Sequence, residues 1–144
     1  MDRGLRIYVY WVTTALTALL FAVPGTLLLA RQPHFGSEMA RLGYPPYLLA
    51  ILGSLKILGV LVVLAPRLKR LKEWAYAGMA LDVVGAVFSH AAVGDEPTKL
   101  IVPIAIGALV LASWALRPPT RTLAGAQPHA RVSQDAPARE GGRA

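Results

Sequence analysis

The chain contains no cysteine and few charged residues. The absence of cysteine excludes thiol–disulfide exchange, iron–sulfur ligation by thiolates and covalent haem attachment. Charged residues make up 16% of the 144 residues, whereas about 25% is usual in soluble domains. Acidic residues are the scarcer kind, with 8 Asp and Glu against 15 Lys and Arg. Because 55% of the chain is hydrophobic, we predict the lipid bilayer as its main partner.

Recognisable catalytic and nucleic-acid-binding patterns are also missing. The chain has no Gly-rich phosphate loop, no His-Glu-x-x-His, no nucleophile elbow and no close carboxylate pair. The basic residues behind its net charge of +7 cluster beside hydrophobic segments, as topology signals do. We therefore predict no catalytic residues, no metal centre and no nucleic-acid partner. Enzymatic activity stays undecided, with its absence favoured.

Four hydrophobic runs are long enough to cross a bilayer as helices. They cover residues 7–30, 47–64, 74–93 and 99–116. The first run exceeds the apolar segment of a signal peptide and lacks a clear cleavage site, so we expect it to be retained. The pattern predicts an all-α integral membrane four-helix bundle formed by residues 1–116. Residues 117–144, rich in Pro, Ala, Gly and Arg, are predicted to form a disordered tail.

Short connections join the predicted spans. Residues 37–42 are expected to form a helical turn at the interface, closed by Gly43. Residues 66–73 are predicted to form a tight basic turn, and residues 94–98 an acidic one.

The basic residues also predict the orientation. With four spans, both termini and the connection 66–73 lie on one side, which carries most of the Lys and Arg: Arg3, Arg6, Arg67, Lys69, Arg70, Lys72 and the tail arginines. The other side has Arg31, Arg41 and Lys99. The bias places both termini, and therefore the tail, in the cytoplasm. The tryptophans agree, because all of them fall at the cytoplasmic ends of their helices, at headgroup level: Trp11, Trp74 and Trp114.

Two opposite charges stand in the middle of adjacent spans. Lys56 and Asp82 each lie about 13 Å from the basic turn along their helices, at a rise of about 1.5 Å per residue. That depth is close to the centre of a hydrocarbon layer about 30 Å thick, where single charges are costly. We therefore predict that Lys56 and Asp82 pair. Two interpretations stay open: a structural pair that fixes helix register, or a functional pair that moves a proton or binds a polar group.

Small residues flank both charges. Gly53 and Gly59 lie on either side of Lys56, and Gly78 and Gly85 lie close to Asp82 on the helix surface. Because small residues let helices approach, we expect these two faces to meet.

Further polar and aromatic residues lie nearer the outer interface. His90 is about 12 Å closer to that interface than Asp82 and points about 80° away, so we expect no direct contact between them. It is an interfacial residue, a member of the polar site or a metal ligand, and His34, Glu38, Asp95 and Glu96 offer no recognised ligand spacing. The predicted intramembrane polar site comprises Lys56, Asp82, Ser89 and His90. Tyr44 and Tyr47 are either interfacial anchors or the mouth of that site.

Several short motifs resemble the DoxX-like family. They are Leu42-Gly43-Tyr44-Pro45, Leu52-Gly53-Ser54-Leu55-Lys56-Ile57-Leu58-Gly59, Lys72-Glu73-Trp74-Ala75-Tyr76-Ala77-Gly78, Asp82-Val83-Val84-Gly85-Ala86 and Ser89-His90. The resemblance covers about residues 7–116 and implies a small four-helix protein of the bacterial inner membrane. The broader DoxX group takes its name from a subunit of a thiosulfate–quinone oxidoreductase, and some relatives are tied to oxidoreductase complexes. No catalytic residues of the family map onto positions here.

Three functional hypotheses follow. The first is a partner subunit or small-ligand binder with a buried Lys–Asp site, working with a protein partner or as a homo-oligomer. The second is a quinone-linked membrane oxidoreductase component, in which Lys56 or His90 donates a hydrogen bond to a quinone carbonyl. The third is a small oligomeric transporter or proton-coupled carrier. We predict no bound cofactor, with quinone as the alternative.

Overall fold

Residues 2–123 are described by the structure, a computed structural model, and their regular secondary structure is entirely helical. The elements are α1 (Arg3–Leu29), α2 (Pro33–Arg41), α3 (Tyr47–Leu64), α4 (Lys69–Ala92), α5 (Pro97–Ala115) and the 3-10 helix η1 (Pro119–Arg121). Most of the predicted disordered tail, residues 124–144, lies outside the described residues. Its first residues, 117–123, are described and include η1.

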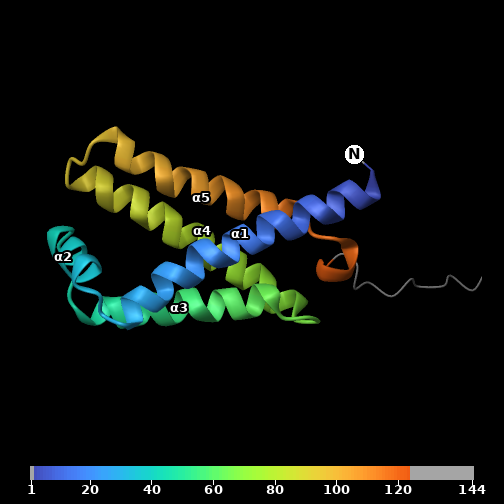
Figure 1. The fold of residues 1–144 in the computed structure, drawn as a ribbon, viewed down its shortest axis with the longest axis horizontal. Helices are drawn as coiled ribbons and strands as arrows, with labels where there is room; N and C mark the ends of the chain where they lie inside the picture. Colours follow the sequence, from blue (N-terminus) through green and yellow to red (C-terminus); the bar gives the residue numbers. More distant parts are fainter. Residues whose placement is uncertain (1, 124–144) are drawn as a thin grey trace, which may run out of the picture.

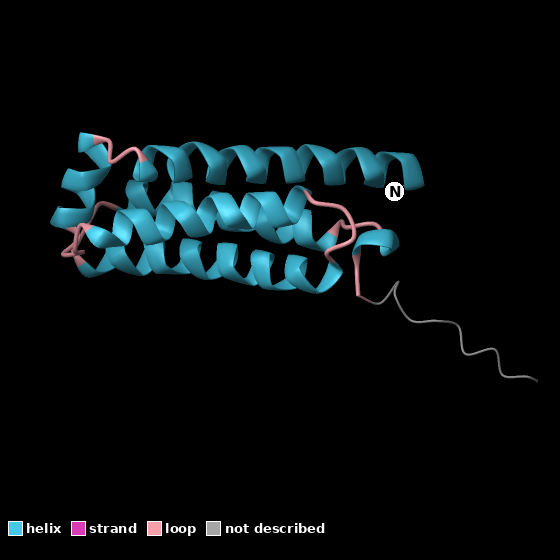
Figure 2. Cartoon of the chain, turned by 90° about the horizontal axis from the view of Figure 1, so that it is seen from below, coloured by secondary structure: helices cyan, strands magenta, loops and turns pink. Residues whose placement is uncertain are grey.

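Four long helices run along one axis, and the short α2 lies across one end of them (Figures 1 and 2). Helix α1 packs against both α3 and α5, and α4 packs mainly against α5. The α3–α4 interface closes the ring and is the smallest of the four. We call the end where α1 and α4 begin, and α3 and α5 end, the basic end. The opposite end carries α2, and we call it the outer end after the predicted orientation.

The helix boundaries follow the prediction most closely where hydropathy changes abruptly. Helix α3 has the predicted bounds, Tyr47–Leu64. Helix α4 begins at Lys69, so the predicted turn 66–73 is too long. The chain breaks where Ala65 is extended before Pro66 (ψ 141°) and Arg67 has a left-handed φ of 65°. The residues from Lys69 on are good helix formers, so the helix begins within this charged segment and not after it.

Glycine turns end two of the helices. Gly43 has a φ of 83°, and the next amide, that of Tyr44, donates to the carbonyl of Met39 at 2.9 Å. This is a Schellman motif, and it ends a helix longer than the predicted turn 37–42. Gly94, with a φ of 71°, ends α4 in the same way, and the amide of Asp95 donates to the carbonyl of His90 at 3.0 Å. The second turn thereby brings Asp95 back over the end of α4.

The surface is more apolar than a soluble protein allows. A small core of side chains from the four long helices fills the centre: Ala18, Phe21, Val60, Val63, Tyr76, Met79, Val83 and Val110. Many large apolar side chains face outward instead, among them Leu19, Leu61, Leu81, Phe88 and Ile101. All four long helices have the length and composition to span a bilayer. The outward-facing surface therefore suits lipid, and the described chain is a four-span membrane protein.

Candidate functional site

Lys56 and Asp82 pair, as predicted from their shared depth. The ammonium group of Lys56 on α3 donates a hydrogen bond to Oδ2 of Asp82 on α4. The Lys56 ammonium also lies over the ring of Phe21 on α1, 4.9 Å from its centroid. The side chains keep 16% and 23% of their surface exposed, so the pair can be reached from outside the core. Since both residues stand near the middle of their helices, the pair lies near mid-membrane depth.

An apolar groove leads to this pair. It encloses about 530 Å³ between α3 and α4, the smallest helix interface of the bundle. Its walls are apolar apart from the ion pair and include Leu52, Leu55, Leu58 and Val62 of α3 and Leu71, Trp74, Gly78 and Met79 of α4. Trp74 and Leu81 on its rim are well exposed, so the groove opens on the lipid-facing surface. Most of it lies between the ion pair and the basic end, and Leu52 extends it one helical turn beyond Lys56.

The small residues around the pair have different neighbours from those expected. Gly59 does face α4, where a Cβ would lie 3.2 Å from Met79. Gly53 faces α1 instead: a Cβ there would lie 2.8 Å from Leu29 and 2.9 Å from the carbonyl oxygen of Gly25. The expectation for Gly78 and Gly85 is wrong, because no atom of another helix in the described chain lies within 4 Å of a Cβ at either position. Gly78 lines the groove, so its missing side chain leaves space in the groove and does not bring the helices together.

Ser89 and Tyr44 form a separate polar contact. The hydroxyl of Ser89 donates to the carbonyl of Gly85 at 2.7 Å, so the Tyr44 hydroxyl, 2.6 Å from the Ser89 oxygen, is the donor in their bond. This bond joins the segment before α3 to α4 near the outer end. Tyr47 is exposed, and within the described part of the chain it makes no polar contact with the Lys56–Asp82 pair. The tyrosines therefore do not line the groove, whose walls lie nearer the basic end.

His90 pairs with Asp95 and not with Asp82. Its Nδ1 lies 2.7 Å from Oδ2 of Asp95, which the Gly94 turn places over the end of α4. Arg41 of α2 reaches the same carboxylate with two hydrogen bonds of 2.9 and 2.7 Å and also bonds to Glu38. These contacts connect α2 to the α4–α5 turn.

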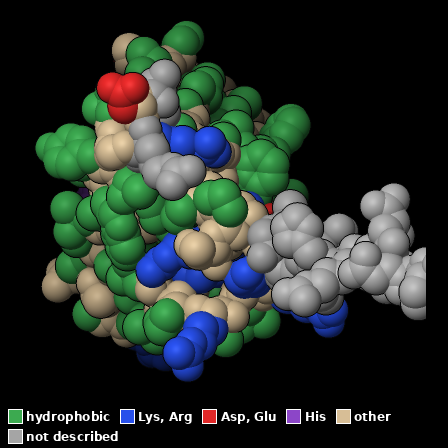
Figure 3. Space-filling model, turned by 90° about the vertical axis from the view of Figure 1, so that its right-hand side faces the viewer, with side chains coloured by type: hydrophobic (Ala, Val, Ile, Leu, Met, Phe, Trp, Pro, Cys, Tyr) green, Lys and Arg blue, Asp and Glu red, His purple; other side chains and the backbone are tan. Residues whose placement is uncertain are grey.

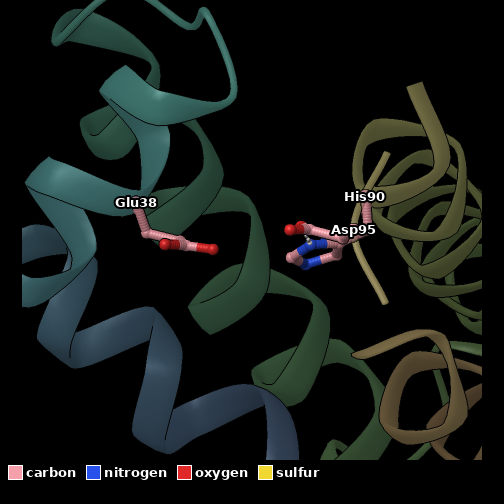
Figure 4. A group of neighbouring side chains, drawn as sticks. All are labelled: Glu38, His90 and Asp95. Carbon is pink, nitrogen blue, oxygen red and sulfur yellow. Dashed lines mark hydrogen bonds and ion pairs between the residues drawn. The ribbon is translucent and has the colours of Figure 1, made fainter. Parts of the chain in front are cut away.

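Glu38, His90 and Asp95 could together hold a cation. Their ligand atoms all lie within 4.8 Å of one another, although the sequence spacing gives no sign of it. Figure 4 shows the Glu38 carboxylate on α2 pointing toward the His90–Asp95 pair. The guanidinium of Arg41 already bridges the two carboxylates, so a cation would have to displace it. In their present arrangement these residues form an ion-pair network.

The charges of this network perturb one another. Hydrogen bonds from Arg41, and then from His90, hold the pKa of Asp95 well below its usual range. The hydrogen bond from Arg41 also lowers the pKa of Glu38. In return, Glu38 and Asp95 raise the pKa of Arg41. Glu38, Arg41 and Asp95 are therefore charged and paired at neutral pH.

A model of the DoxX-like family matches residues 12–113. The chain belongs to the DoxX-like family. The match runs from α1 to the end of α5, and it includes the ion pair and the groove. No curated protein and no solved structure matches the chain.

Sequence reasoning missed a second group of charges in this DoxX-like protein, at the basic end. The sequence predicts Lys72 to lie in the turn 66–73. In the structure Lys72 is 1% exposed, and its ammonium donates to the carbonyls of Val62 and Val63 in the last turn of α3. Arg117, assigned to the tail, is 3% exposed and donates to both carboxylate oxygens of Glu73, at 2.9 and 3.0 Å. The indole of Trp114 donates to the same carboxylate at 2.9 Å. A single sequence does not show which helix ends lie side by side.

A buried hydroxyl network lies next to this group of charges, about one helical turn farther from the basic end. The Ser113 hydroxyl lies 2.8 Å from both the Thr14 and the Tyr76 hydroxyls and so joins α5 to α1 and α4. Thr14 and Thr17 are fully buried, while Thr13 bonds back to the carbonyls of its own helix. The threonine face thus supplies one interhelical bond, made by Thr14.

Proposed function

We propose that this DoxX-like protein binds a small lipophilic ligand in the groove between α3 and α4. The observation that carries the proposal is the position of the Lys56–Asp82 pair at the deep end of an otherwise apolar cavity. Pockets of this kind, apolar with a few convergent polar groups, are typical small-molecule sites. The lateral opening lets a ligand enter from the bilayer. Binding without catalysis is the simplest role for such a site.

The depth of the pair restricts the chemistry of the ligand. Asp82 lies eleven positions after Leu71, the residue at the shallow end of the groove, which corresponds to about 16 Å along α4. An ordinary acyl chain from the nearer leaflet would place its terminal methyl group against the ion pair. A better ligand carries a hydrogen-bond acceptor at the buried end and an apolar remainder. Lys56 has further N–H donors beyond the one given to Asp82, and a ketone or quinone carbonyl would accept from them.

The geometry favours Lys56 over His90 as the donor to a carbonyl. Lys56 lines the groove, whereas His90 is engaged with Asp95 at the outer end. A quinone is therefore the first ligand to test. A protein partner or a second copy of the chain, covering the groove with a helix, is the competing occupant.

The orientation and location belong to the same proposal. We expect the basic end to face the cytoplasm from a bacterial inner membrane, because the described cations at that end outnumber its carboxylates.

Trp74 offers a direct test of ligand binding, since it lines the groove and is 75% exposed. A decyl-substituted benzoquinone added to the detergent-solubilised protein should quench tryptophan fluorescence saturably. The saturable part should disappear in Trp74→Phe. It should weaken about tenfold in the double variant Lys56→Met with Asp82→Leu, which loses the charge-assisted hydrogen bond without leaving one charge unpaired. Lys99→Met, which removes a cation at the outer end, is the matched control and should leave it unchanged. Equal, non-saturating quenching in all variants would reject the site.

A further inference from the structure

Three cations meet inside the basic end with too few carboxylates to balance them. Lys72 and Arg117 are almost fully buried, and Arg121 on η1 is half-buried, with its guanidinium 4.7 Å from the Trp11 ring. The positive charge of Lys72 is repelled by those of Arg117 and Arg121. Glu73 is the carboxylate bonded to this group, and both its oxygens are engaged by Arg117. Figure 3 faces this end and shows further Lys and Arg side chains gathered around it.

Arg117 leaves one of its donors unused. Its Nε donates to the Trp114 carbonyl at 2.9 Å and its Nη2 to Glu73. Its Nη1 is buried and has no hydrogen-bond partner among residues 2–123. A buried guanidinium amino group without an acceptor is unfavourable, so the described residues leave room for an acceptor from outside the chain.

A second groove is lined by Glu73 and Tyr76, two side chains that Arg117 contacts. It encloses about 300 Å³ between α4 and α5, on a different face of α4 from the ligand groove. Its wall starts at Glu73, Tyr76 and Trp114 and continues along Ala77, Ala80 and Leu111. Arg117 stacks over the Tyr76 ring, 5.0 Å from its centroid, and bonds to Glu73, so its guanidinium adjoins the residues at the polar end of this groove. The rest of the wall is apolar and faces lipid.

We propose that an anionic phospholipid from the leaflet at the basic end binds here. Its phosphate group would accept from Arg117, with Lys72 and Arg121 supplying further positive charge, and one acyl chain would follow Ala77 and Ala80. A planar guanidinium matches the geometry of phosphate oxygens, and the phosphate would satisfy the unused donor. A free anion would fill the polar end alone, whereas a phospholipid fills both the polar end and the apolar groove. The proposal does not depend on the ligand of the α3–α4 groove.

The test measures thermal stabilisation of the detergent-solubilised full chain by phosphatidylglycerol, with phosphatidylcholine and inorganic phosphate as separate arms. Phosphatidylglycerol should raise the unfolding temperature saturably, and the other two should have little effect. Arg117→Lys keeps the charge but loses the planar donor pair, and it should raise the half-saturating lipid concentration about tenfold. Ala77→Leu should do the same by filling the groove without changing any charge.

Two controls separate a built site from general attraction to the membrane surface. Arg70→Gln removes an exposed cation from the same end, and Ala105→Leu enlarges an exposed residue of α5 outside the groove. Neither should change the lipid dependence. Equal weakening by Arg70→Gln and Arg117→Lys would overturn the proposal in favour of diffuse attraction. Equal stabilisation by inorganic phosphate, with no effect of Ala77→Leu, would overturn the proposal in favour of a free anion. The absence of any stabilisation by phosphatidylglycerol would also overturn the proposal.

Discussion

The ammonium group of Lys56 bonds to the carboxylate of Asp82 across the same α3–α4 interface that contains the larger groove. The pair is partly exposed to the groove, and its charges compensate each other in a low-dielectric environment. Both open interpretations, structural and ligand-binding, require this contact, and mutation separates them.

Removing one member of the pair should be worse than removing both. Asp82→Asn is expected to destabilise the bundle by about 3 kcal/mol, because it leaves the Lys56 charge without its partner. The double change Lys56→Met with Asp82→Leu replaces the pair by apolar groups and should be milder. Thermal unfolding in detergent compares the two, and a double variant as unstable as Asp82→Asn would count against energetic coupling. If the double variant is stable but no longer binds the quinone, the pair serves binding more than folding.

Two glycines should respond differently to the same small change. Gly53→Ala places a methyl group 2.8 Å from Leu29 and 2.9 Å from the Gly25 carbonyl, and overpacking of this kind costs about 2 kcal/mol. Gly78→Ala adds a methyl group to open space and should leave stability unchanged or raise it by up to about 1 kcal/mol, since Ala favours helix. Unfolding in detergent measures both. A larger loss in Gly78→Ala would mean that the groove is closed in solution.

The ion-pair network at the outer end should weaken in acid. The pKa values of Asp95 and Glu38 are lowered in the folded protein, so the stability they contribute is present above their unfolded pKa values, about 4. It is lost as the pH falls through the lower folded values. Arg41→Gln should therefore lower the unfolding temperature at pH 7 but have less effect in acid. Arg31→Gln removes an exposed cation at the same end and serves as the control. A pH-independent difference between wild type and Arg41→Gln would contradict this reasoning.

The absence of cysteine makes the proposed orientation directly measurable. A cysteine introduced at exposed Arg70 should be protected from a membrane-impermeant maleimide in intact spheroplasts and become reactive after lysis. A cysteine at Glu96, on the α4–α5 turn, should react before lysis. The reverse pattern would place the basic end outside the cytoplasm.

Hydropathy and depth were sufficient to predict much of this protein. The bounds of α3 follow from where its apolar run stops, and the Lys56–Asp82 contact follows because two charges at one depth on adjacent helices need each other. The neighbours of Gly53 and of Arg117 could not be predicted. Periodicity shows which face of a helix is small or polar, but it does not show that α1 lies closer to Gly53 than α4 does. Similarly, the Glu73–Arg117 contact depends on the packing of α4 against α5, which brings two distant positions in the sequence together.

The His90–Asp95 contact was partly accessible from sequence. A glycine just past the end of a helix, as Gly94 is, is typical of a left-handed cap, and such a cap brings the next residue back toward the last turn. That pattern alone would have placed Asp95 near His90. The participation of Arg41 and Glu38 would still have been missed, because it depends on where α2 lies.

The fixed separation between the ion pair and the shallow end of the larger groove has a consequence for selectivity. Leu71 and Asp82 lie on the same helix, α4, so the helical rise sets the length between them. A homologous series of alkyl quinones should therefore show an optimum tail length. Simple partitioning would instead give affinities that rise steadily with every added methylene.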